Sequence, residues 1–115
     1  MRAFRNKIRE TYNLEDVNSE IVLNLYDKKE KINEMNQIID EYIEYLGIGL
    51  SNLINIFEPD AICIGGSFVH YERIFMKKLE NNLKSKFKNR DIPKILLAKY
   101  GNDAGIIGAA MLKSN

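Results

Sequence analysis

The chain has 115 residues, of which 45% are hydrophobic and 29% are charged, and its formal net charge is +1. These values are typical of one soluble globular domain and exclude an overall charge that would attract nucleic acid or a membrane. No apolar run reaches the roughly eighteen residues that a membrane-spanning helix needs, and no apolar signal segment follows Met1. We therefore expect residues 1–115 to form a single cytoplasmic domain with no membrane partner.

The first thirty residues, 1–30, are predicted to be a helical lead-in. Apolar residues recur at spacing four over residues 2–12, which predicts a short helix that Asn13 ends. Asn18 or Ser19 is suited to cap a second helix, because either side chain accepts hydrogen bonds from free backbone N–H groups. The sequence does not choose between these two caps.

Residues 31–57 carry the clearest element of the chain. Their apolar residues advance by three or four positions throughout, which predicts one long amphipathic helix. Glu58 precedes Pro59, and a residue before proline is disfavoured in the α region, so we expect the helix to end there. Gly47 and Gly49 lie in its interior, where glycine costs about 1 kcal/mol relative to alanine. We expect a strand or another helix to pack closely against this part.

Residues 58–115 are predicted to form a β-α-β-α unit. Residues 61–64 form a continuous apolar tetrad, which is the pattern of a central parallel strand buried on both faces. Three further elements are predicted: a helix over 71–87, a second strand over 95–98, and a last helix through Leu112 that Asn102 or Asp103 caps. The crossover between the strands should be right-handed, so the two strands should be parallel. The predicted fold class is α/β.

The carboxyl ends of the two strands should lie on one rim, where α/β folds bind ligands. The turn Gly65-Gly66-Ser67 follows the first strand, and residues 99–103 follow the second. Glycine lets a ligand approach the backbone closely, and Ser67 can form one hydrogen bond to it. A glycine pair after a strand also serves an ordinary turn, because turns need positive φ angles. Both interpretations stay open.

The pattern of residues gives little support for metal or catalytic chemistry. Cys63 is the only cysteine and lies in an apolar run, which predicts a small buried core residue. His70 is the only histidine, and no ligand spacing typical of zinc or iron is present. The sequence has no phosphate loop, no nucleophile elbow and no recognisable acid pair. We predict no metal site and no catalytic residue in this chain.

Two blocks carry a resemblance to a known family: YLGIGLSNLINIFEPDAICIGGS, residues 45–67, and GNDAGIIGAAML, residues 101–112. In order and spacing they resemble the carboxyl-terminal part of the ROK family, the bacterial repressors, open reading frames and sugar kinases of the actin-like ATPase superfamily. The resemblance covers residues 30–112. It implies a partial actin-like, ribonuclease-H-like lobe in which the turn Gly65-Gly66-Ser67 contacts adenosine and residues 101–110 form a helix that connects two lobes.

The resemblance also implies cofactors. Kinases of the family transfer the γ-phosphate of ATP to a hexose hydroxyl, with an aspartate as base and magnesium on the phosphates, so ATP and magnesium are expected for the intact parent protein. The family's phosphate loop, catalytic aspartate, sugar-contacting residues and zinc motif match no residues here. We therefore expect a carboxyl-terminal fragment that is inactive alone. Ser67 stands where a third glycine is common.

Three functions remain open. The leading hypothesis is the adenosine-side lobe of an ATP-dependent sugar kinase. The alternatives are a sugar-responsive transcriptional repressor of the same family, which alone would bind nucleic acid, and a structural or dimerisation module. An actin-like lobe has three more strands than the two predicted here, so an edge or face should be exposed. We expect the missing amino-terminal lobe or self-association into a homo-oligomer to cover it.

Overall fold

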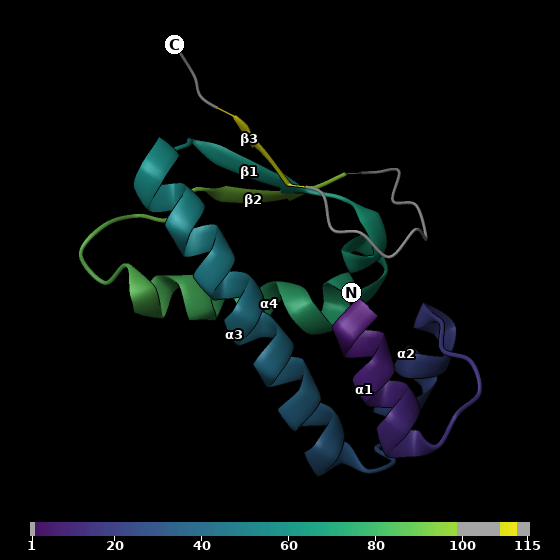
Figure 1. The fold of residues 1–115 in the computed structure, drawn as a ribbon. Helices are drawn as coiled ribbons and strands as arrows, with labels where there is room; N and C mark the ends of the chain where they lie inside the picture. Colours follow the sequence, from purple (N-terminus) through teal and green to yellow (C-terminus); the bar gives the residue numbers. More distant parts are fainter. Residues whose placement is uncertain (1, 99–108, 113–115) are drawn as a thin grey trace.

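The computed structural model describes residues 2–98 and 109–112. In chain order the elements are α1 (Arg2–Tyr12), α2 (Ser19–Asp27), α3 (Ile32–Phe57), β1 (Ala61–Ile64), the 3-10 helix η1 (Gly66–Tyr71), α4 (Glu72–Lys86), β2 (Lys94–Leu97) and β3 (Ala109–Leu112). Figure 1 shows the sheet at one end of the molecule, with α1 and α2 beside the opposite half of the long helix α3. Among the described residues, no helix is long and apolar enough to cross a membrane.

The helices before the sheet form where the sequence predicts them. Asn18, and not Ser19, caps α2, because its Oδ1 accepts a hydrogen bond of 2.9 Å from the backbone N–H of Ile21. Helix α3 ends at Phe57 as predicted. Glu58 leaves the helix through the left-handed region, with φ 46° and ψ 53°, and its N–H donates to the carbonyl of Ile54 at 2.9 Å. This backbone N–H therefore closes the last turn of α3.

Helix α4 packs against the glycine-containing part of α3. A Cβ atom at Gly47 would overlap the Oδ1 of Asn82 on α4, whereas a Cβ atom at Gly49 would meet no described residue within 4 Å. The predicted close packing is therefore confirmed at Gly47. Gly49 lies on the other side of α3, and the prediction is wrong there.

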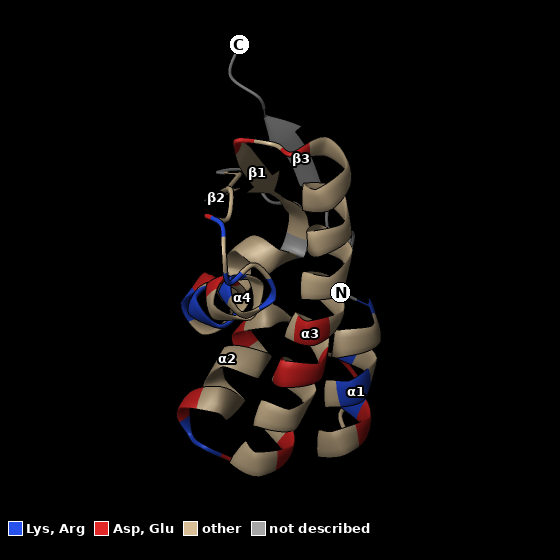
Figure 2. Cartoon of the chain, turned by 90° about the vertical axis from the view of Figure 1, so that its left-hand side faces the viewer, with Lys and Arg blue, Asp and Glu red and all other residues tan. Residues whose placement is uncertain are grey.

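Three ion pairs connect α4 to α2 and α3. Figure 2 shows basic residues of α4 beside acidic residues of α3. The N···O distances are 2.8 Å for Arg73 with Asp27, 2.8 Å for Lys78 with Asp40 and 2.6 Å for Lys86 with Glu44. Asn82 also donates a hydrogen bond of 2.7 Å to Glu44. Exposed ion pairs stabilise a fold only slightly, so we infer that they mainly orient α4 on α2 and α3.

The sheet has the strand order β2-β1-β3, and β1 pairs with β2 in parallel, as predicted. The prediction that β1 is buried on both faces is correct for one face only. Ile62 and Ile64 are fully buried on the face that the helices cover, but Ala61 and Cys63 are half-buried. The prediction of a buried Cys63 is therefore wrong, because no helix among the described residues covers the outer face of the sheet (Figure 1).

Residues 109–112 form strand β3 and not the end of the predicted last helix. Strand β1 has β2 on one edge, and its other edge would leave N–H and C=O groups unpaired. Strand β3 satisfies these groups in an antiparallel ladder that pairs Ala61 with Leu112 and Ile64 with Ala109. The predicted caps, Asn102 or Asp103, lie outside the described residues.

The packing of α3 on α4 gives a first prediction. We expect Gly47→Ala to lower the free energy of unfolding by about 1 kcal/mol, because overpacking costs about 1–3 kcal/mol and helix propensity returns about 1 kcal/mol. Gly49→Ala is the matched control and should raise this free energy by up to about 1 kcal/mol. Urea denaturation in dilute solution measures both values. Equal effects of the two substitutions would contradict the packing of Asn82 on Gly47.

A second prediction concerns Glu44. Hydrogen bonds from Lys86 first and Asn82 second hold the pKa of Glu44 below its ordinary value of 4.5. The contribution of this carboxylate to stability is therefore fully present above pH 4.5 and is lost as the pH falls through the lowered pKa. We expect Glu44→Gln to lower the Tm at neutral pH and to have no effect at the acid end. Glu41→Gln, on the same helix, should keep the wild-type profile in thermal melts.

Candidate functional site

The predicted turn follows β1 directly. Gly65 is extended, with φ −120° and ψ −166°, whereas Gly66 has a positive φ of 76°. Glycine has no Cβ atom that would clash at a positive φ, so this angle by itself favours glycine at position 66. Ser67 follows in the first turn of η1. The three predicted site residues therefore form one continuous stretch of backbone at the end of the strand.

This turn lies on a rim that three strand ends share. The backbone N–H of Ala98, at the end of β2, donates to the carbonyl of Ile64 at 2.9 Å. Ala109, at the start of β3, pairs with Ile64 from the other side. The prediction that the segment after the second strand starts on the same rim as Gly65 is thus confirmed. The predicted turn 99–103 lies outside the described residues.

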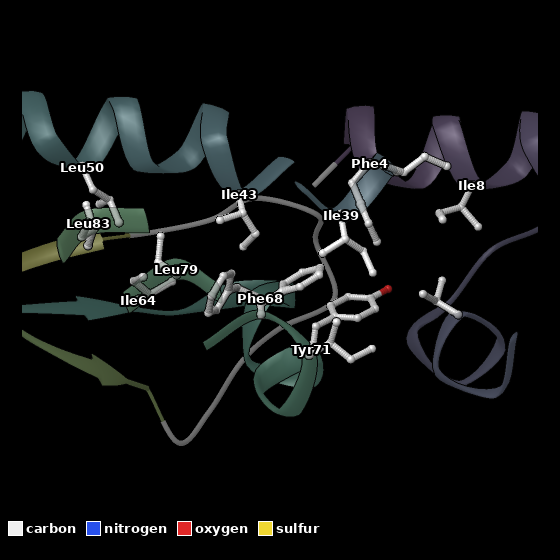
Figure 3. Packing of buried hydrophobic residues seen from close by; sticks show 14 of the residues in the cluster. Phe4, Ile8, Ile39, Ile43, Leu50, Ile64, Phe68, Tyr71, Leu79 and Leu83 are labelled. Atoms are coloured by element: carbon white, nitrogen blue, oxygen red, sulfur yellow. The ribbon is translucent and has the colours of Figure 1, made fainter. Parts of the chain in front are cut away.

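The inner side of the turn is anchored by η1, which the sequence analysis missed. Phe68 and Tyr71 are both 0% exposed, and the Tyr71 ring stacks on Phe75 of α4 at a centroid distance of 5.0 Å. Figure 3 shows both side chains pointing into the packed cluster. Phe68 and Tyr71 are three residues apart, which is the period of a 3-10 helix. This spacing is the feature of the sequence that could have predicted η1. The anchor holds the turn from inside and leaves Gly65 and Gly66 half-buried at the rim.

The rim has the chemistry of a binding surface. Gly65 and Gly66 present backbone without side chains, and within 4 Å a Cβ atom added at Gly65 would have one neighbour among the described residues, the Cβ of Ala98 at 3.4 Å. His70 is exposed on η1. Within the described part of the chain, no three His, Cys, Asp or Glu side chains are grouped so that they could hold a metal ion. The described rim can therefore contact a ligand through its backbone.

The described residues thus define a small α/β unit with a glycine turn at the carboxyl end of its central strand. The profile of the ROK family matches residues 2–115, and the chain belongs to this family.

Curated relatives are sugar kinases by name. An N-acetyl-D-glucosamine kinase of Aliivibrio fischeri is 34% identical over 77 residues, which cover 64% of this chain and 24% of the relative. A beta-glucoside kinase of Klebsiella pneumoniae is 34% identical over 96 residues, which cover 84% of this chain and 30% of the relative. The chain thus spans between about a quarter and a third of the length of these relatives.

Proposed function

We propose that this chain is the adenosine-side part of an ATP-dependent sugar kinase, within an actin-like lobe of a cytoplasmic protein. Membership of the ROK family and the sugar-kinase names of its relatives support the class of reaction. In this proposal the turn Gly65-Gly66-Ser67 lies against the adenosine of ATP. ATP with magnesium is the phosphate donor, and a hexose hydroxyl is the acceptor in the whole protein.

The glycine at position 65 is the observation that carries this proposal. Gly66 is explained by its positive φ, but the extended backbone of Gly65 is one that any residue adopts. A Cβ atom there would make only a contact of 3.4 Å with Ala98, so the described fold leaves room for alanine. Bare backbone at this position is therefore best explained by a ligand that approaches the rim closely.

The proposed role is binding and not catalysis. Backbone N–H and C=O groups position a ligand, whereas phosphoryl transfer needs a base and charges that stabilise the transferred phosphate. The match covers 24% of the length of the Aliivibrio fischeri kinase. In the proposal, the base and the charged groups belong to a region that corresponds to the rest of that relative. We therefore expect the chain alone to transfer no phosphate from ATP to glucose. The kinase names of the relatives favour this function over a repressor.

Nuclear magnetic resonance titration of the 15N-labelled chain with ADP tests the proposal. We expect the amide signals of Gly65 and Gly66 to shift, with a dissociation constant of about 1 mM because only part of a nucleotide site is present. Adenosine should shift the same signals, and pyrophosphate should not. An unchanged spectrum with both ADP and adenosine would contradict adenosine contact at this turn.

Substitutions separate the ligand role of the turn from its role in the fold. Gly65→Ala should keep the thermal melt of the wild type and weaken ADP binding about tenfold, because one methyl group blocks close approach. Gly66→Val should weaken binding too, but with a lower Tm, because valine is strained at a φ of 76°. Gly49→Ala, on α3 and open to solvent, is the control and should bind like the wild type. Wild-type affinity in Gly65→Ala would refute the proposal.

A further inference from the structure

His70 lies on the outer side of η1, close to the glycine turn. A 3-10 helix has three residues per turn, so side chains three residues apart lie on the same side. Phe68 and Tyr71 are both 0% exposed and mark the side of η1 that packs into the core. His70 is exposed and falls on the side that begins at position 67. Its imidazole is therefore a surface group on the segment that begins at Gly66.

The direction of side chains in a helix places the imidazole near this turn. In right-handed helices the Cα–Cβ bond tilts toward the amino-terminal end, so a side chain covers the turn before its own Cα atom. For His70 this is the turn at position 67, about 6 Å back along the axis of η1 at about 2.0 Å per residue. Gly66 directly precedes that position. The imidazole and the bare backbone of the glycines therefore border the same part of the rim.

An ion pair lies on the other side of His70 along the chain. Arg73, three residues after His70, pairs with Asp27 at the end of α2, with an N···O distance of 2.8 Å. Helix α2 also packs against η1. These contacts fix the carboxyl-terminal side of His70, whereas the glycine turn lies on its amino-terminal side. Packed helices therefore set the position of His70 relative to the turn.

A flat ring beside bare backbone suits a flat ligand. Histidine is one of the side chains on which nucleobases stack in complexes with proteins. Gly65 and Gly66 have no side chains that would hold a ligand away from the backbone. A base that lies against this backbone comes within reach of the imidazole face. The sugar and the phosphates of a nucleotide have no flat surface that could use such a face.

We propose that the imidazole of His70 stacks on the adenine ring of the nucleotide and favours a purine base at this rim. The inference rests on the proposed nucleotide site at Gly65 and Gly66, and it names the side chain that recognises the base there. The bare backbone sets how closely adenosine approaches, and the imidazole sets which base is accepted. A purine has two fused rings and covers the imidazole more fully than the single ring of a pyrimidine, so it stacks more strongly.

The exposure of His70 separates this role from a role in the fold. Side chains that hold η1 in place are buried, as Phe68 and Tyr71 are. Substitutions at exposed positions usually change stability little. We therefore expect replacement of His70 to keep the thermal melt of the wild type. A change in ligand binding then reports contact with the ligand.

Nuclear magnetic resonance of the imidazole tests the stack directly. Because His70 is the only histidine of the chain, its two imidazole carbon–proton signals are assigned without ambiguity. In the titration with ADP we expect them to move upfield as the amide signals of Gly65 and Gly66 shift, because the ring current of a stacked adenine shields the imidazole protons. Adenosine should produce the same shift, and ribose 5-phosphate, which lacks the base, should not.

The two sets of signals distinguish the inference from the proposed function. Imidazole signals that stay in place while the glycine amides shift would overturn the stack and leave the adenosine contact of Gly65 intact. If neither set shifts with ADP or adenosine, the nucleotide site and the stack are both refuted.

Substitutions of His70 measure the contribution of the ring. His70→Ala should weaken ADP binding about tenfold, which corresponds to about 1.4 kcal/mol. His70→Phe keeps a flat ring and should bind ADP within about threefold of the wild type. His70→Gln keeps polar atoms without a ring and should be as weak as the alanine variant. Tyr45→Ala, which removes an 80% exposed ring from α3, is the matched control and should bind like the wild type.

The preference for a purine gives the last measurement. The ratio of the dissociation constants of CDP and ADP should fall in His70→Ala and stay near the wild-type value in His70→Phe. Wild-type affinity for ADP in His70→Ala would overturn the proposal, and so would a phenylalanine variant as weak as the alanine variant. The amide signals of Gly65 and Gly66, followed in the same samples, show whether the nucleotide site itself is intact.

Discussion

The contact of Phe75 with four other aromatic rings holds the structure together. The centroid distances are 5.0–5.4 Å, and the rings are those of Phe4, Tyr42, Phe68 and Tyr71. They come from α1, α3 and η1, so one side chain of α4 joins the helical half of the chain to the segment that follows β1. Each such pair contributes about 0.5–1.5 kcal/mol beyond its buried area. The position of the glycine turn depends on this cluster, because η1 begins at Gly66.

The same cluster explains why α3 has two different faces. Tyr42 and the buried residues of α3 face α1, α4 and the aromatic rings, and Gly47 admits α4. Because α1 is only 11 residues long and α3 has 26, the second half of α3 extends past α1. Tyr45 and Ile56 are exposed for this reason. The glycine rim and these exposed side chains of α3 are therefore on different elements, and substitutions at one need not disturb the other.

The parts of the fold that depend on local periodicity could be predicted from the sequence. The bounds of α3 and the parallel pairing of β1 with β2 follow from helical spacing and crossover handedness. Features that depend on how distant segments pack could not be predicted. Cys63 is half-buried because no described helix covers the outer face of the sheet. Residues 109–112 form a strand because they pair with the edge of β1 that β2 does not occupy. Neither condition is visible in a local pattern.

In the candidate site, too, the sequence predicts one part and the structure is needed for the rest, and the two parts are the adjacent residues Gly65 and Gly66. The sequence treats Gly65 and Gly66 alike, because a glycine pair after a strand fits both a turn and a ligand rim. The backbone angles distinguish the two residues. The positive φ of Gly66 explains a glycine at that position, whereas the extended backbone of Gly65 does not call for glycine. A plain turn needs one glycine here and a ligand rim benefits from two. The hypothesis of a nucleotide site therefore depends on Gly65, although Gly66 is the residue for which the turn favours glycine.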